Sequence, residues 1–219
     1  QHDMSPITVF EALRLQRASP ATIFRPMAIR EIIEVPDPRL KTVSTSVEPH
    51  EFNDELKTLV EDMFETMYDA PGIGLAAIQG AVPKRVLVID LQEPDMDADP
   101  IEEECGTGCC EPTTKQPVKN DPRVYINPVI VNPADELKTY NEGCRSLPEI
   151  FADIDRPATC TVQYQDIEGK HHEEHLDGLM ATCIQHEMDH LEGIVFTDHL
   201  SRLKRGMALK KLKKLRAAA

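Results

Sequence analysis

The stretch GLMATCIQHEMDHLEG, residues 178–193, decides how this sequence is interpreted. It ends on a glycine, as helices commonly do, and we predict a helix after Asp177-Gly178 that runs to Glu192. Inside this helix His186 and His190 are four residues apart, so their side chains point within roughly 40° of each other. Both imidazoles can then reach one metal ion.

Glu187 completes the motif H-E-x-x-H, in which a glutamate acts as general base beside a metal. A catalytic metal also needs a third protein ligand and an open position. The chain beyond the motif offers none, because Phe196 occupies the place of the third histidine in metzincin-type proteases and no glutamate follows Glu192. We therefore expect the third ligand upstream, where Cys144 in EGCRSLP (142–148) offers a thiolate. The alternative role for Cys144 is a buried thiol without a metal.

The block GIGLAAIQ, residues 72–79, follows a predicted helix and precedes a predicted strand. Its glycines do not continue into a phosphate-binding fingerprint, because the next residues are Leu, Ala and Ala. Glycines of this kind let a backbone approach a ligand closely. We expect such an approach here, with the Gln79 amide as a positioned hydrogen-bond donor.

A second helix is predicted over residues 54–69. Its apolar residues recur at helical spacing and form one stripe. Asn53 or Asp54 is the expected cap at its start, and Ala70-Pro71-Gly72 ends it.

Several strands are predicted between and after these blocks. The apolar runs at 85–90 and 124–131 are typical of buried strands. Residues 158–166 alternate between apolar and polar and lead through a turn at Glu168-Gly169 into a strand that ends near Leu176. Strands followed by one long helix favour an α+β fold with mostly antiparallel sheet.

Composition excludes several classes of protein. The chain has 219 residues, of which 41% are hydrophobic, and we expect one main domain. No apolar run approaches the roughly 18 residues of a membrane span, which predicts a soluble protein without membrane contact. A net charge of −14 disfavours binding to DNA. Six cysteines without a secretory signal favour the cytoplasm.

Three segments stand apart from the predicted core. Residues 1–26 form an N-terminal extension whose origin stays open between an organelle-targeting peptide, a native extension and an expression remnant. Residues 92–122 are acidic, with five prolines and three cysteines, and are predicted to be a surface loop. After Asp198 the chain is basic, and Leu200, Leu203, Met207 and Leu212 indicate an amphipathic C-terminal helix.

The blocks GIGLAAIQ at 72–79, EGCRS at 142–146 and QHEMDH at 185–190 together resemble the peptide deformylases. The likeness runs from about Met27 to the basic tail, which makes residues 27–219 a deformylase-like catalytic domain with an acidic insertion at about 92–122. The resemblance implies an α+β fold with antiparallel sheets packed around a central helix carrying the HExxH metal motif. Position 145 departs from the family pattern, because it is Arg where Leu is common, and the insertion is longer than usual.

The resemblance also implies a reaction and a set of roles. Metal-bound water attacks the formyl carbon of a formyl-methionine at the start of a newly made polypeptide, and formate is released. The single divalent metal is ferrous iron in the native state, replaceable by zinc, nickel or cobalt. Its ligands are Cys144, His186 and His190. Glu187 is the acid/base, and Gln79 with the backbone N–H of Arg145 stabilises the oxyanion.

Further residues are assigned to substrate and support by the same resemblance. The substrate site draws on Ile73, Gly74, Leu75, Tyr140, Leu179 and Cys183. Glu142 and Arg156 pair and brace the Cys144 bend. The expected partners are N-formylmethionyl nascent peptides and, through the basic C-terminal helix, the ribosome. Two alternatives stay open, an HExxH metallopeptidase and a non-catalytic metal-binding protein associated with the ribosome.

Overall fold

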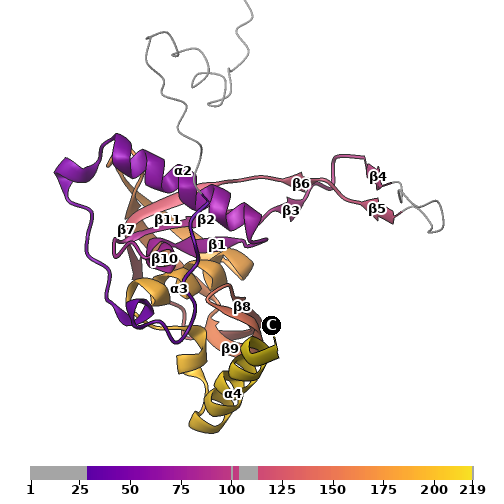
Figure 1. Cartoon of the computed structure of the whole chain (residues 1–219). Helices are drawn as coiled ribbons and strands as arrows, with labels where there is room; N and C mark the ends of the chain where they lie inside the picture. The colour runs from indigo at the N-terminus through magenta and orange to yellow at the C-terminus, as the bar shows by residue number, and fades with distance from the viewer. Residues whose placement is uncertain (1–28, 100, 104–112, 219) are drawn as a thin grey trace, which may run out of the picture.

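The computed structural model describes residues 29–99, 101–103 and 113–218, and within them the chain is α+β with antiparallel sheets (Figure 1). The extension 1–26 and the three cysteines of the insertion lie outside the described residues. The helices are α2 (Asp54–Asp69), α3 (Gly178–Leu191) and α4 (Arg202–Ala218), with short 3-10 helices η1 (Pro38–Lys41), η2 (Pro49–Glu51), η3 (Ala77–Gly80) and η4 (Phe196–His199). The strands are β1 (Gly74–Ala76), β2 (Val86–Ile89), β3 (Glu93–Pro94), β4 (Ile101–Glu103), β5 (Thr113–Lys115), β6 (Val118–Lys119), β7 (Arg123–Val131), β8 (Leu137–Cys144), β9 (Leu147–Pro157), β10 (Thr159–Gln165) and β11 (His171–Asp177).

The largest sheet has the strand order β1-β2-β7-β10-β11, and every neighbouring pair is antiparallel. Helices α2 and α3 lie on its two sides (Figure 1). Strand β2 is buried on both faces, because Val86 and Val88 pack in the cluster with α2 while Leu87 and Ile89 pack in the cluster with α3. This explains why its sequence is continuously apolar rather than alternating.

Helix α2 confirms the prediction for residues 54–69. The Asn53 side chain accepts hydrogen bonds from the backbone N–H groups of Glu55 and Leu56, so it is the cap. The stripe of apolar residues is buried against β1 and β2. The helix therefore fixes the start of the 72–79 block at the edge of the sheet.

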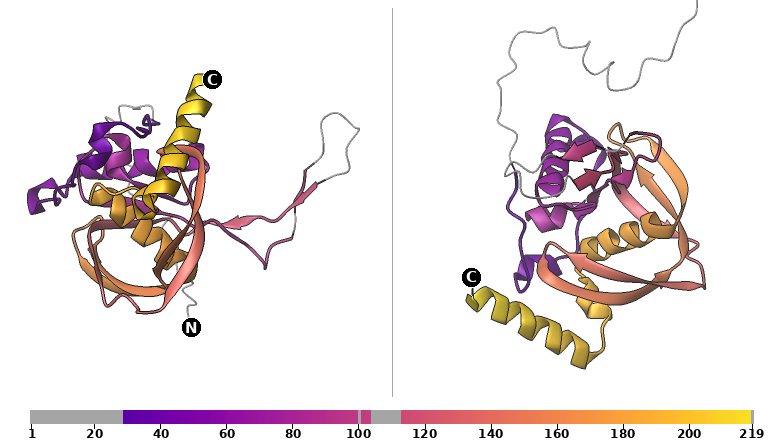
Figure 2. Two further views of the ribbon diagram at one scale, coloured as in Figure 1. Left: turned by 90° about the horizontal axis from the view of Figure 1, so that it is seen from below. Right: turned by 90° about the vertical axis from the view of Figure 1, so that its right-hand side faces the viewer.

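A long hairpin of β8 and β9 was not predicted as strands. It pairs from Leu137 opposite Pro157 to Gly143 opposite Phe151, and its register shifts just before Cys144. The hairpin passes beside α3 and contacts α4 (Figure 2). A third apolar cluster holds it there, formed by Leu147, Ile150, Ile154, Val195, Phe196 and Leu212. This packing holds the end of β8 beside helix α3, so that Cys144 lies close to the two histidines.

The prediction of a loop over residues 92–122 is wrong for the described part. Strands β3 with β6, and β4 with β5, form two short antiparallel ladders in a ribbon that runs away from the body (Figures 1 and 2). Opposite charges face each other where Glu93 pairs with Lys119, and Thr113, Thr114 and Val118 are β-branched. These local preferences favour strands, whereas the prolines of the segment had indicated a loop.

The C-terminal helix is confirmed as α4, but its buried side differs from the expected one. Leu212 is buried, whereas Leu203 and Met207 are 75% and 64% exposed. Ala208 and Leu209 pack with Leu212 against the β8–β9 hairpin instead. Among the described residues no helix is long and apolar enough to cross a membrane.

Candidate metal centre

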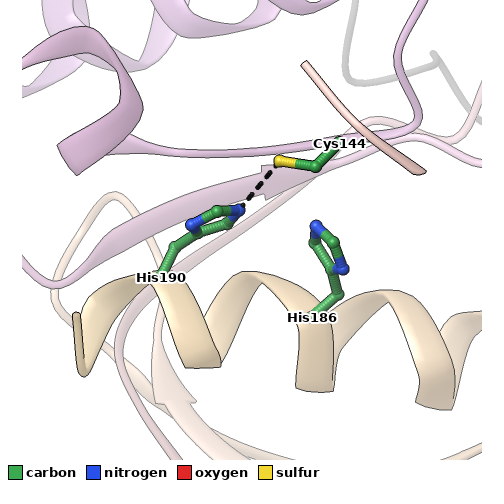
Figure 3. A group of neighbouring side chains, drawn as sticks. All are labelled: Cys144, His186 and His190. Carbon is green, nitrogen blue, oxygen red and sulfur yellow. Dashed lines mark hydrogen bonds between the residues drawn. The ribbon is translucent and has the colours of Figure 1, made fainter. Parts of the chain in front are cut away.

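Three side chains from two distant stretches meet at the end of β8. Cys144 offers its sulfur, and His186 and His190 of α3 each offer a ring nitrogen; these ligand atoms all lie within 4.8 Å of one another (Figure 3). The Cys144 Sγ to His190 Nε2 distance is 3.2 Å. The structure therefore brings together the three residues predicted as ligands. Their role as ligands stays a prediction.

Glu142 sets the tautomer of His186. Its Oε2 accepts a hydrogen bond from His186 Nδ1 at 2.8 Å, and since a carboxylate only accepts, the hydrogen belongs to Nδ1. Nε2 is then the ring nitrogen that can bind a metal. Burial favours the neutral acid, but His186 and Arg156 outweigh it and hold the pKa of Glu142 below its ordinary value.

Arg156 binds Glu142 through two hydrogen bonds, from Nε to Oε1 at 2.5 Å and from Nη2 to Oε2 at 3.0 Å. Its Nη1 donates to Asp189 Oδ2 at 2.9 Å, and Asp189 precedes His190 on α3. Only 6% of the Arg156 side chain and 5% of the Glu142 side chain are exposed, so water screens this pair little. One guanidinium thus supports both strand β8 and the helix that carries the histidines.

The chemistry of Cys144 fits a transition metal. Burial opposes ionisation, but His190 and His186 outweigh it and hold the pKa of the thiol well below its usual value. A thiolate with two imidazoles suits zinc, iron, nickel or cobalt rather than magnesium or calcium. Beside it, Glu187 Oε2 is buried without a hydrogen-bond partner among the described residues. A buried acceptor without a partner calls for a further donor, which agrees with a water molecule at a metal.

Glu187 follows His186 on α3 and is only 4% exposed. Burial raises the pKa of its carboxyl, although the two histidines act in the opposite direction. Gly74 of β1 passes directly against it, and a Cβ at position 74 would lie 2.6 Å from Glu187 Oε1 and 2.8 Å from Cys183 Sγ. Position 74 is therefore glycine because the strand edge and the acid are in close contact.

Gln79 lies in η3 with its amide orientation fixed by three contacts. Its Oε1 accepts from the backbone N–H of Ala76 at 2.9 Å. Its Nε2 donates to Ser146 Oγ at 3.2 Å and lies 3.5 Å from Cys144 Sγ. The N–H donors of this amide therefore face the cysteine. The Arg145 guanidinium donates to the carbonyl of Pro71 on the opposite wall.

Many of these groups line one cavity of about 330 Å³, although His190, Arg156 and Ser146 are not among its lining residues. Of the residues assigned to the substrate, Ile73, Gly74, Tyr140, Leu179 and Cys183 all line it, and so do Glu142, Cys144, Arg145, His186 and Glu187. Leu75 differs, because its side chain is 2% exposed and packs in the cluster with α2. Only the backbone of Leu75 therefore remains available to contact a substrate.

Sequence reasoning missed two supporting residues. Ser146 accepts the hydrogen bond from Gln79, and Asp189 accepts one from Arg156. Asp189 could have been found, because it stands inside the H-E-x-x-H motif as an acid next to a candidate ligand. Ser146 stands in the EGCRS block, but nothing in the sequence indicates that it binds Gln79, which lies 67 positions away.

Known proteins resemble this chain over most of its length. The family model of polypeptide deformylases matches residues 29–206. A peptide deformylase from Erythrobacter litoralis is 74% identical over 196 residues, covering 88% of this chain and all of the relative. One from Novosphingobium aromaticivorans is 65% identical over 197 residues with the same coverage.

Solved structures agree with these relatives. The crystal structure of a peptide deformylase from Legionella pneumophila is 39% identical, covers 87% of this chain and 97% of its own, and has a TM-score of 0.71. That of the Ehrlichia chaffeensis enzyme in complex with actinonin is 37% identical, covers 85% and 97%, and has a TM-score of 0.70. With its Cys-His-His cluster and its antiparallel α+β fold, this chain belongs to the peptide deformylase family.

Proposed function

We propose that this chain removes the formyl group from formyl-methionine at the start of newly made polypeptides and releases formate. The observation that carries the proposal is the convergence of Cys144, His186 and His190 beside the buried Glu187, in a chain 74% identical to a named peptide deformylase. The reaction is hydrolysis of an amide. It needs an activated water, a proton acceptor and a donor to the developing oxyanion.

One divalent metal is held by Cys144, His186 and His190 in this proposal, on the central helix α3 that carries the HExxH motif. The metal supplies Lewis acidity, which lowers the pKa of a bound water toward neutrality. Ferrous iron is the proposed native metal, and zinc, nickel or cobalt suit the same donors. The lowered pKa of Cys144 and the hydrogen bond that His186 Nδ1 makes to Glu142 support this assignment.

Glu187 moves the proton in the proposed reaction. It accepts a proton from the attacking water and then delivers it to the departing amine, so that a free amino terminus results. Its burial and its raised pKa support this role, because a carboxyl with a pKa nearer neutrality exchanges protons more readily at physiological pH.

The oxygen that becomes negatively charged is bound by the amide of Gln79 and the backbone N–H of Arg145. The fixed orientation of Gln79 supports its role, since its Oε1 is occupied by the N–H of Ala76 and its Nε2 faces Cys144. Loss of one such donor typically lowers the rate by about 10²–10³-fold.

The methionine side chain enters an apolar pocket formed by Ile73, Tyr140, Leu179 and Cys183, and the peptide pairs with the backbone of Gly74 as an added strand. Strand β1 supports the second point, because it is the edge strand of the five-stranded sheet, and among the described strands it pairs only with β2. Leu75 contributes through its backbone at most.

The proposal also covers the domain bounds, the role of helix α4 and the location in the cell. Residues 27–219 form the catalytic domain with its insertion at about 92–122, and the basic helix α4 contacts the ribosome near emerging chains. Lys204, Lys210, Lys213 and Lys214 are exposed on that helix, which supports contact with an anionic surface. A cytoplasmic location, or an organelle if residues 1–26 are a targeting segment, stays a prediction.

The experiment is formate release from formyl-Met-Ala-Ser by the chain loaded with ferrous iron without oxygen. Stoichiometric release of formate is expected, and none would contradict the function. Cleavage of internal peptide bonds would favour a metallopeptidase instead. Metal binding without turnover would favour the non-catalytic alternative.

A further inference from the structure

Arg145 is the only lysine or arginine among the described residues that line the cavity. It follows Cys144 in the turn between β8 and β9, and its side chain is exposed. The guanidinium reaches the carbonyl of Pro71, which belongs to the segment between α2 and β1 and lines the same cavity. The exposed Arg145 side chain therefore connects two segments that line the cavity.

No ion pair neutralises this guanidinium within the part of the chain that the structure describes. Its partner there is a neutral carbonyl, bound by Nη2, which leaves Nε and Nη1 available for another acceptor. The acids of the cavity do not occupy it. Glu142 is bound to Arg156 and His186, Glu187 is buried, and Glu149 of β9 forms no ion pair with it among the described residues.

We infer that Arg145 makes the enzyme select substrates that carry an acidic residue directly after the formyl-methionine or one position later. This inference rests on the proposed function. In the proposed function the formyl group lies at the buried Glu187 and the peptide pairs with Gly74, three residues after Pro71, so we expect the residues after methionine to pass near Arg145 and Pro71. A carboxylate there matches the planar donors of a guanidinium better than the Pro71 carbonyl does, because the pair is charge-assisted and bidentate.

The test compares substrates that differ only in charge. We would measure kcat and KM for formyl-Met-Glu-Ser, formyl-Met-Gln-Ser and formyl-Met-Lys-Ser, and for formyl-Met-Ala-Glu with formyl-Met-Ala-Gln, all as C-terminal amides so that no other carboxylate is present. At low salt we expect kcat/KM to favour Glu over Gln by about 2–5-fold at one of the two positions, with Lys below Gln. The preference should lie in KM, because the contact is made equally in ground and transition states. It should disappear in about 1 M salt, where charges are screened within roughly 3 Å.

Variants test whether Arg145 causes the preference for Glu over Gln. Because the backbone N–H of Arg145 is proposed to act in the reaction, each variant is judged by its Glu-to-Gln ratio and not by its absolute rate. Arg145→Leu should bring the ratio to about one, and Arg145→Lys should retain part of it. Lys57→Leu, which removes the same charge from an exposed site on α2 outside the cavity, should leave it intact.

Three results would overturn the inference: equal kcat/KM for Glu and Gln at both positions in the wild type, a preference for Lys, or a Glu preference that survives in Arg145→Leu. The first two leave deformylation itself standing, since formate is still released. Absence of formate from every peptide would instead contradict the proposed function, and this inference with it.

Discussion

Glu142 of strand β8 and His186 of helix α3 are joined by a hydrogen bond of 2.8 Å, although 44 positions separate them in the sequence. Because Cys144 lies two residues after Glu142, this bond couples the position of the sulfur to that of the imidazole. Arg156 holds Glu142 from the other side. The geometry of the candidate ligands is thus fixed before any metal binds.

Glu142→Gln should weaken metal binding by about 10- to 100-fold, because an amide cannot replace the charged acceptor of His186 and Arg156. Competition with a chromophoric chelator measures the metal affinity. Asp153→Asn is the control, since this exposed acid of β9 binds only Asn141 in the described structure and its loss should leave metal affinity unchanged. Wild-type affinity in Glu142→Gln would show that the bond does not support the ligands.

Glu187→Gln should lower kcat by about 10²–10⁴-fold while metal content stays at the wild-type level. The substitution keeps the size of the side chain and removes its ability to accept a proton. Formate release and metal analysis on the same sample separate the two effects. Unchanged turnover would contradict the assigned proton transfer, and loss of metal would indicate a ligand instead.

Gly74→Ala should destabilise the protein by about 1–3 kcal/mol and lower its activity, because the added methyl group meets Glu187 and Cys183 in a filled space. Urea unfolding and formate release are the measurements. Gly206→Ala provides the matched comparison, since a Cβ there, in helix α4, meets nothing within 4 Å. Its stability should rise by up to about 1 kcal/mol. Equal effects of the two substitutions would refute the close contact at position 74.

Asp198→Asn should make the free energy of unfolding depend less on pH in the acidic range. Burial favours the neutral acid, but Lys41 and the backbone N–H of Val195 hold the pKa of Asp198 below its ordinary value. A carboxyl with a lowered pKa in the folded state stabilises the fold above its unfolded value of about 3.9, and this contribution disappears as the pH falls through the lower folded value. The variant should therefore be less stable at pH 7 and lose less between pH 5 and pH 3.

Urea unfolding at several pH values, with both proteins at equal metal content, measures this difference. Asp135→Asn removes an exposed acid that forms no ion pair among the described residues, and it should follow the wild-type curve. Parallel curves for Asp198→Asn and the wild type would show that the ionised Asp198, with its partners Lys41 and Arg205, contributes nothing to the acid sensitivity.

Much of the fold followed from local patterns. The stripe of α2, the continuous apolar run of β2 and the alternation of β10 each reflect a period that one segment carries by itself. The β8–β9 hairpin escaped prediction because β8 is largely exposed and its residues LKTYNEGC show no apolar alternation. The charged pairing and β-branched residues of the insertion were outweighed by its prolines.

The residues of the site could be predicted where they lie close together in the sequence. The spacing of His186 and His190 is a helical property, so both could be identified together. Contacts between distant segments were not: no local pattern indicates that Ser146 receives Gln79, or that the Arg145 guanidinium reaches Pro71. Leu75 was assigned to the substrate by the resemblance, which does not show that its side chain packs in the cluster with α2 while Ala76 packs in the cluster with α3.

The most direct measurement of the central claim is X-ray absorption at the metal edge of the zinc-substituted protein, with Cys144→Ser as comparison. One sulfur at about 2.3 Å and two nitrogens at about 2.0–2.1 Å are expected, with the sulfur missing in the variant. A wild-type spectrum without sulfur, or a sulfur signal that persists in Cys144→Ser, would show that the metal is bound elsewhere.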